Sequence, residues 1–171
     1  MALVLLRHTQ PDIAPGVCYG QTDLDVASTF DADAARVLAD LPSVSRIVSS
    51  PLMRCRKLAE FIAQARVLGM TEDPRLMEMD FGCWEGKAWS EIPRPEIDAW
   101  ADDFFHARPH GGESVAALTA RTRAALSDWR DETRTTLIVT HAGVIRAAHA
   151  QGETAEAFSF PIDFGEHVRL P

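Results

Sequence analysis

Apolar and polar positions follow one another in blocks that predict alternating strands and helices. The continuous apolar run Ala2–Leu6 is typical of a strand buried on both faces. Short runs predict further strands at Arg46–Ser49, within residues 66–72 and at Thr135–Thr140, and the tail predicts an edge strand near His167–Leu170. Strands of this kind favour a mostly parallel sheet in the interior of the protein.

Helical periodicity occupies the segments between these strands. Apolar residues recur at helical spacing in residues 28–41 and 113–130, and a further helix is expected from His141 to about residue 150. Ser50-Pro51 predicts a helix start, because serine can cap and proline at the first position loses no needed hydrogen bond. The alternation predicts a single three-layer α/β/α domain over residues 1–171, with helices on both faces of the sheet.

Residues 78–112 differ from the rest, because prolines and glycines interrupt any long periodicity. We expect an inserted, lid-like segment with short helices near residues 88–91 and 95–106. Three of the four tryptophans of the chain lie here: Trp84, Trp89 and Trp100. They form either the core of the lid or a platform on which a flat ring can stack.

The composition narrows the possible partners. The chain has 171 residues with a formal net charge of −8, which disfavours a general affinity for nucleic acid or for an anionic membrane. The apolar start is too short for a signal peptide and no run reaches the length of a membrane span. Cys18, Cys55 and Cys83 are far apart and lack zinc-binding spacing, so we expect reduced thiols in a cytoplasmic protein and no metal site.

The candidate chemistry lies where predicted strands end. Arg7-His8 follows the first strand and His141 follows the strand Thr135–Thr140. Arg54 falls in the first turn of a predicted helix, where free N–H groups and the helix dipole attract anions. Ligands of open α/β sheets collect at the carboxyl edge, so these residues predict a phosphate pocket. The alternative is that each residue is structural by itself, with His141 merely capping a helix.

Five segments resemble the signature of the histidine phosphatase (phosphoglycerate mutase-like) superfamily. They stand in the family's order: Leu6-Arg7-His8-Thr9, Val48-Ser49-Ser50-Pro51-Leu52-Met53-Arg54, Leu76 to Gly86 with Glu78 and Trp84-Glu85-Gly86, Gly112-Glu113-Ser114, and Val139-Thr140-His141-Ala142-Gly143. Each segment is weak alone, and together they are specific. The resemblance implies a phosphoglycerate mutase-like fold.

The resemblance also implies a mechanism that needs neither metal nor cofactor. His8 would attack phosphorus and become a phosphohistidine, while Arg7, Arg54 and His141 would surround the phosphate oxygens. Glu78 would protonate the leaving alkoxide and then help to deprotonate the water that cleaves the phosphohistidine. The substrate would be a small phosphomonoester.

The chain resembles one subgroup of this superfamily more closely. Val17-Cys18-Tyr19-Gly20-Gln21-Thr22-Asp23 and Trp84 to Trp89 are similar to α-ribazole phosphatase-like proteins of cobalamin biosynthesis. Thr9, Tyr19, Gly20 and Gln21 are therefore candidate substrate-binding residues. The first loop departs from the family, because Arg-His-Gly-Glu has become Arg-His-Thr-Gln and Ala14 stands near the place of an asparagine that contacts phosphate.

Two residue assignments and the function of the chain stay open. Glu85 is expected to be structural, and Glu113-Ser114 either only starts the helix 113–130 or also touches the substrate. The leading function is a phosphatase of a small molecule, such as α-ribazole 5′-phosphate. The alternatives are a phosphatase of another phosphate, such as a sugar phosphate, a mutase, or a catalytically silent binding module. The sequence leaves the oligomeric state open.

Overall fold

The computed structural model describes residues 2–170, which fold around one five-stranded sheet. Its order is β3-β2-β4-β1-β5, and among these strands β5 alone is antiparallel to its neighbour. The mostly parallel sheet predicted from the apolar runs is therefore confirmed. The strands are β1 (Leu3–Arg7), β2 (Arg46–Ser49), β3 (Met70–Glu72), β4 (Thr136–Thr140) and β5 (His167–Leu170).

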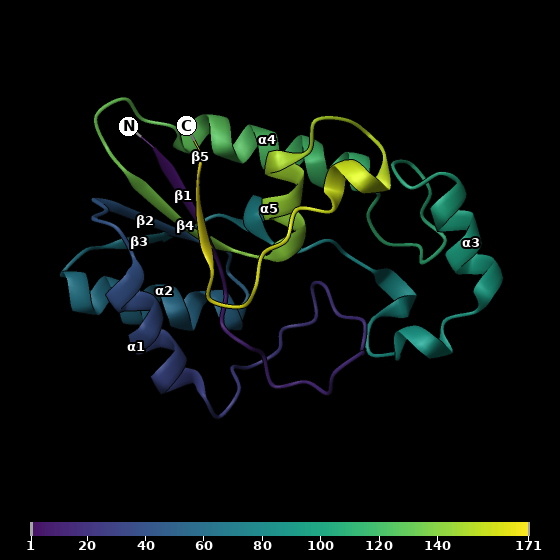
Figure 1. Ribbon diagram of the computed structural model, residues 1–171, viewed down its shortest axis with the longest axis horizontal. Helices are drawn as coiled ribbons and strands as arrows, with labels where there is room; N and C mark the ends of the chain where they lie inside the picture. Colours follow the sequence, from purple (N-terminus) through teal and green to yellow (C-terminus); the bar gives the residue numbers. More distant parts are fainter. Residues whose placement is uncertain (1, 171) are drawn as a thin grey trace.

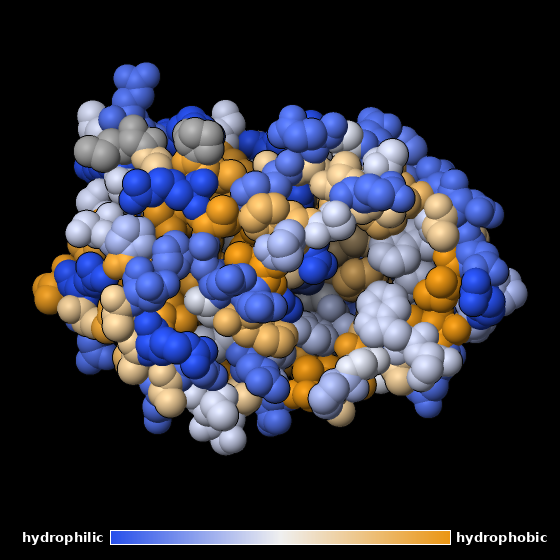
Figure 2. Space-filling view, viewed as in Figure 1, coloured by the Kyte–Doolittle hydropathy of each residue, from blue (hydrophilic) through white to orange (hydrophobic). Residues whose placement is uncertain are grey.

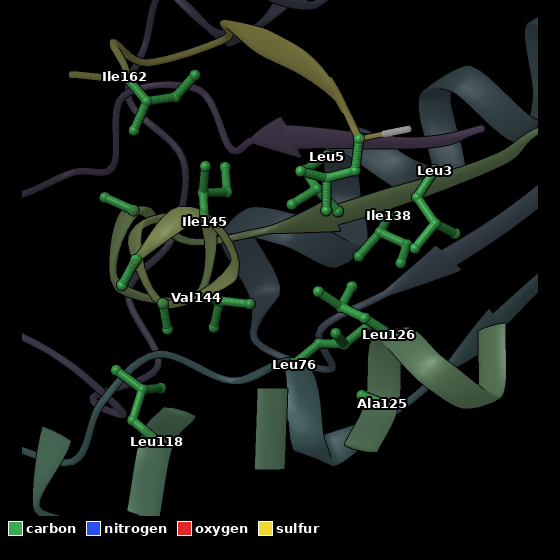
Figure 3. Close-up of a cluster of buried hydrophobic side chains, with 14 of the residues drawn as sticks. Leu3, Leu5, Leu76, Leu118, Ala125, Leu126, Ile138, Val144, Ile145 and Ile162 are labelled. Carbon is green, nitrogen blue, oxygen red and sulfur yellow. The ribbon is translucent and has the colours of Figure 1, made fainter. Parts of the chain in front are cut away.

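Helices cover both faces of the sheet, as Figure 1 shows. On one face α1 (Phe30–Asp40) and α2 (Met53–Arg66) pack on Val4 and Leu6, and on the other α4 (Val115–Trp129) and α5 (Ala142–His149) pack on strand residues such as Leu3 and Leu5. Successive residues of a strand point to opposite faces, so the continuous apolar run of β1 supplies both layers. Figure 3 shows the second layer, with Leu126 of α4 and Ile145 of α5 facing the strands. The three-layer prediction is confirmed.

The segment between β3 and α4 lies beside the layered body, at the right of Figure 1. It contains three short 3₁₀ turns, Pro74–Leu76, Gly82–Trp84 and Trp89–Glu91, and the helix α3 (Arg94–Asp102). Trp84 is fully buried in a small core of its own with Cys18 and Ile92. Burial of this ring supports the interpretation of Trp84 as lid core.

Several predicted boundaries are wrong. The helix expected at Ser50-Pro51 begins at Met53, because the Ser50 hydroxyl accepts from the Leu52 N–H at 3.3 Å and does not cap the helix. The first strand begins at Leu3 and continues through Arg7, since Arg7 pairs with Thr140.

The other differences shorten elements at their ends. Residues 66–72 keep only the strand Met70–Glu72, because Val67 ends α2 in the left-handed conformation. The helix expected over 95–106 is α3, which ends at Asp102, and the helix expected over 113–130 is α4, which begins after its cap Ser114. The Ser114 hydroxyl accepts from the Ala117 N–H at 3.1 Å, as an N-cap does.

Candidate active site

Sheet pairing brings the two strand-end histidines together. β1 lies parallel to β4 with Arg7 opposite Thr140, so the next residue of each chain segment, His8 and His141, leaves the same edge of the sheet. Their ring centroids are 5.2 Å apart. The residues are 133 positions apart in the sequence, and only this pairing makes them neighbours.

His8 is held in the neutral form that a nucleophile needs. Its Nδ1 lies 2.6 Å from the carbonyl oxygen of Thr9, which can only accept, so Nδ1 carries the proton and Nε2 keeps its lone pair. Burial of the ring lowers the pKa of His8 well below its usual 6.5, and the cations Arg54 and Arg7 lower it further. The Thr9 contact raises the pKa and does not cancel these effects.

Two arginines surround His8 with donors that are only partly used. Arg54 is fully buried, and its Nη2 and Nη1 donate to the carbonyls of Gly20 at 2.6 Å and Thr22 at 2.9 Å. Arg7 donates from Nη1 to the Ile162 carbonyl at 2.8 Å. The Nε–H of each arginine is buried and makes no hydrogen bond with any residue from 2 to 170. Unpaired buried donors beside a neutral histidine favour an anionic ligand.

His141 closes this group at the start of α5. Its Nε2 lies 2.8 Å from the Ser50 hydroxyl and 3.4 Å from the Sγ of the buried Cys55. Burial lowers the pKa of His141 well below 6.5, and Arg54 and then His8 lower it further. The ring is therefore neutral without a ligand, and an anion beside it would favour its protonated form.

Glu78 faces the same cavity from the segment that follows the first 3₁₀ turn. Its Oε1 accepts from the Met79 N–H at 2.8 Å and its Oε2 from the Gly143 N–H at 3.1 Å. A Cβ at position 143 would overlap Oε1, so a glycine at the start of α5 is what admits this carboxyl. Each oxygen retains a lone pair that can carry a proton toward the cavity.

Glu85 has a different environment, although it belongs to the same sequence motif. Its carboxylate accepts from the N–H groups of Gln21 at 2.9 Å and Phe81 at 3.1 Å, and from both the N–H and the hydroxyl of Thr22. Burial alone would raise the pKa of Glu85, but these donors outweigh it and hold the pKa below its usual value. Glu85 is therefore an ionised structural anchor of the loop at residues 20–22.

The cavity in front of His8 has a volume of about 360 Å³. Figure 2 shows a hollow on this face, between the layered body and the segment that contains α3. Arg7, His8, Tyr19, Glu78 and Arg146 supply its polar groups. The remaining wall is apolar and rich in aromatic rings: Val17, Met79, Phe81, Trp89, Trp100, Phe104, Val115, Leu118, Ala142, Ala155 and Phe158, with the backbone of Gly143.

A profile of the histidine phosphatase superfamily (branch 1) matches residues 3–167. The chain belongs to this superfamily. The adenosylcobalamin/alpha-ribazole phosphatase of Escherichia coli (strain K12) is 31% identical, over 96% of this chain and 87% of the relative. The family resemblance of the five motifs is thus confirmed.

Two solved structures share the fold of this histidine phosphatase. The mycobacterial glucosyl-3-phosphoglycerate phosphatase in complex with inorganic phosphate has a TM-score of 0.84 and 28% identity, over 99% of this chain and 89% of that one. The phosphoglycerate mutase of Thermus thermophilus has a TM-score of 0.80 and 30% identity, over 99% of this chain and 92% of that one. The predicted phosphoglycerate mutase-like fold is confirmed.

The four candidate substrate-binding residues of the phosphatase occupy different places. Tyr19 lines the cavity, and the Arg54 guanidinium lies 5.3 Å from its ring centroid. Thr9 is buried behind the cavity, and its hydroxyl makes no hydrogen bond within the described part of the chain. Gly20 and Gln21 do not line the cavity. Instead, the Gly20 carbonyl accepts a hydrogen bond from Arg54, and the Gln21 N–H donates one to Glu85.

Sequence reasoning missed two residues of the site. Arg146 lines the cavity from α5, four positions after Ala142, and this helical spacing from the V-x-H-x-G motif is the signal that could have found it. Phe164 stacks on the Arg7 guanidinium, 3.8 Å from ring centroid to carbon, and lies 5.6 Å from the His8 ring. Phe164 comes from the irregular tail, where no pattern marked it.

The cysteines were expected to be reduced thiols, and one of them, Cys55, lies beside His141. All three cysteines are free thiols, and burial raises the pKa of Cys18 to about 12 and that of Cys55 further. Within residues 2–170, no three His, Cys, Asp or Glu side chains cluster as they would around a metal ion. No helix in that range is both long and apolar enough to cross a membrane.

Proposed function

We propose that this histidine phosphatase is a metal-independent phosphomonoesterase that works through a phosphohistidine at His8. The observation that carries the proposal is the state of His8, a buried neutral imidazole whose Nδ1–H is tied to a carbonyl and whose Nε2 keeps its lone pair. The unpaired Nε–H groups of Arg7 and Arg54 lie beside His8. There they would stabilise the negative charge on the oxygens of a phosphate under attack.

In the first step Nε2 of His8 attacks phosphorus in line, the N–P bond forms and the ester P–O bond breaks. Arg7, Arg54 and His141 stabilise the charge on the phosphoryl oxygens. The leaving alkoxide takes a proton from the carboxyl of Glu78, which becomes a carboxylate. The two backbone N–H groups that bind Glu78 hold the carboxyl at the cavity wall during this transfer.

In the second step water attacks the phosphohistidine. The Glu78 carboxylate takes a proton from that water, the N–P bond breaks, and the electron pair returns to Nε2 of His8. Inorganic phosphate leaves, and both side chains are back in their starting states. Apart from the substrate and the attacking water, the chain itself provides every group used in the two steps.

The wall of the cavity favours a substrate whose organic part is apolar and flat. Trp89 and Trp100 lie nearly parallel, 12° apart with centroids separated by 6.5 Å, and Phe104 and Phe158 extend the aromatic surface. Aromatic rings bind flat rings by stacking. A heteroaromatic nucleoside phosphate such as α-ribazole 5′-phosphate fits this description, and a relative of the chain is named for that substrate.

Arg146 favours a second candidate. Its side chain adds a positive charge to the cavity close to Arg7, while its Nε donates to the Phe160 carbonyl at 3.2 Å. A carboxylate on the substrate would pair with this guanidinium. A carboxylated phosphate such as 3-phosphoglycerate, turned over by a phosphatase or by a mutase, is the class that this feature supports.

A side-by-side assay tests both candidates. Purified protein is given α-ribazole 5′-phosphate, 3-phosphoglycerate and a sugar phosphate in the presence of EDTA, and phosphate release is compared with transfer to a second acceptor. We expect release to water with a higher kcat/KM for α-ribazole 5′-phosphate than for 3-phosphoglycerate. The reverse order selects the second candidate, retention of the phosphoryl group on product selects a mutase, and no turnover of any ester selects a silent binding module.

A further inference from the structure

Glu78 lies on a stretch of backbone that has no regular structure of its own. Between the 3₁₀ turns Pro74–Leu76 and Gly82–Trp84 the chain forms neither helix nor strand. A carboxyl that transfers a proton must be placed to within about an ångström, and loop backbone does not provide that by itself. Contacts from outside the segment must therefore fix its position.

Arg121 of α4 uses every donor that a guanidinium has, and three of the five bind the backbone from Arg75 to Glu78. Its Nη1 donates to the carbonyls of Arg75 and Met77, both at 2.6 Å, and its Nη2 donates to the carbonyl of Glu78 at 3.0 Å. The two remaining donors reach Glu113, from Nε at 2.7 Å and from Nη2 at 2.9 Å. Five N–H groups make five hydrogen bonds, three of them to the backbone that leads to the carboxyl.

Glu113 binds the far end of the same segment. Its side chain accepts from the Asp80 N–H at 3.4 Å, and its own N–H donates to the Asp80 carbonyl at 2.8 Å. The Arg121 and Glu113 side chains are only 19% and 15% exposed, so the pair is well shielded from water. Together the two side chains bind the backbone on both sides of Glu78, from residue 75 to residue 80.

We propose that Arg121 and Glu113 are positioning residues that hold the Glu78 carboxyl against the substrate's leaving oxygen. The inference rests on the proposed role of Glu78 as the general acid. It gives the pair a role in the proton transfers of Glu78, to the leaving group and later from the attacking water, and leaves attack by His8 to other residues. A purely structural role, in which the pair only joins α4 to the sheet edge, would affect every substrate alike.

The test uses two substrates that need the acid to different degrees. Arg121→Gln and Glu113→Gln are compared with the parent protein on an alkyl phosphate and on 4-nitrophenyl phosphate. The nitrophenolate leaves with little protonation, and the alkoxide does not. We expect kcat/KM, which reports transfer to His8 and not the later hydrolysis of the phosphohistidine, to fall about 10²-fold on the alkyl phosphate and less than about 5-fold on the nitrophenyl ester. A displacement of about an ångström of a catalytic group has an effect of this order.

Arg123→Gln is the matched control, because Arg123 is exposed on the same helix two positions away. It removes the same charge and should leave both rates unchanged. Arg121→Lys is the second variant, since it keeps the charge but has a point-like head that cannot reach three carbonyls and a carboxylate at once. It should reproduce the same selective loss in smaller degree, and it keeps the test open if Arg121→Gln does not fold.

Equal losses on both substrates, in variants whose thermal midpoint shows that they are folded, would overturn the inference. The Glu78→Gln variant separates its failure from that of the proposed function. If Glu78→Gln shows the selective loss and the Arg121 and Glu113 variants do not, the positioning role alone is wrong. If Glu78→Gln also lacks the selective loss, Glu78 is not the acid, and the positioning role of Arg121 and Glu113 is refuted as well.

Discussion

Replacing Glu78 by glutamine removes the proposed proton donor and leaves almost the same shape. The parent carboxyl accepts one backbone N–H at each oxygen, from Met79 and from Gly143. Glutamine has one carbonyl oxygen, so one of these N–H groups would face an amide NH₂ and lose its acceptor. We expect the free energy of unfolding to fall by about 1 to 3 kcal/mol, and we expect the variant to remain folded.

The catalytic loss should be larger and selective. General acid catalysis contributes about 10² to 10⁴ in rate, which corresponds to about 2.7 to 5.4 kcal/mol of transition-state stabilisation. Glu78→Gln should lose this factor on an alkyl phosphate, whose alkoxide is a poor leaving group. It should lose much less on 4-nitrophenyl phosphate, because that leaving group departs without a proton.

The assay measures kcat/KM for a series of esters of rising leaving-group pKa, with Glu85→Gln as the matched control. This ratio reports transfer to His8 and not the later hydrolysis of the phosphohistidine. Glu85 is ionised and anchors the loop whose carbonyls hold Arg54, so its loss should weaken phosphate binding by a similar factor for every ester. A steep dependence on the leaving group for Glu85→Gln and a flat one for Glu78→Gln would refute the assignment of the acid.

Three further predictions concern the nucleophile, metal ions and pH. His8→Ala should fold and keep less than about a tenth of the parent rate on any ester, because covalent catalysis needs its nucleophile; a higher residual rate with no phosphohistidine detected by mass spectrometry at alkaline pH would contradict the mechanism. Chelation with EDTA should leave kcat/KM unchanged, and recovery of lost activity on adding Mg²⁺ or Zn²⁺ would point to a metal-dependent reaction. His8 and His141 have a pKa below 6.5 in the folded protein, so the unfolded chain binds more protons below that pH, and stability that is complete above pH 6.5 is lost as the pH falls. The free energy of unfolding should therefore fall as the pH drops below about 6.5, by at most about 1.4 kcal/mol per pH unit for each histidine, measured by urea unfolding. His141→Asn should reduce that slope; an unchanged slope would show that the histidine is not buried in its neutral form.

Local pattern predicted the layered architecture and a phosphate pocket at the sheet edge, and the family resemblance supplied the role proposed for each residue. The apolar run at the start of the chain predicted a strand buried on both faces, and β1 supplies side chains to both layers of helices. Arg7-His8, Arg54 and His141 were found because each follows a strand end or opens a helix, and the parallel pairing of β1 with β4 brings such ends to one edge. The predicted helix start at Ser50-Pro51 was wrong because the serine hydroxyl has nearby partners in Leu52 and His141.

The sequence itself gives the identity of each side chain. Helical and strand periodicity can be recognised in it, because they depend on residues only a few positions apart. They determined the order of strands and helices, the acidic charge and the candidate residues of a phosphate pocket. Contacts between segments that are distant in the sequence cannot be predicted in this way, and they determine the remaining features of the site. The burial that keeps His8 neutral, the anchoring of Glu85, and the binding of Arg121 to the backbone of Glu78 across 43 positions exist only after folding. The same holds for the stacking of Phe164 on Arg7. Burial and hydrogen bonding set the charge and position of each group, and only the packed chain fixes both.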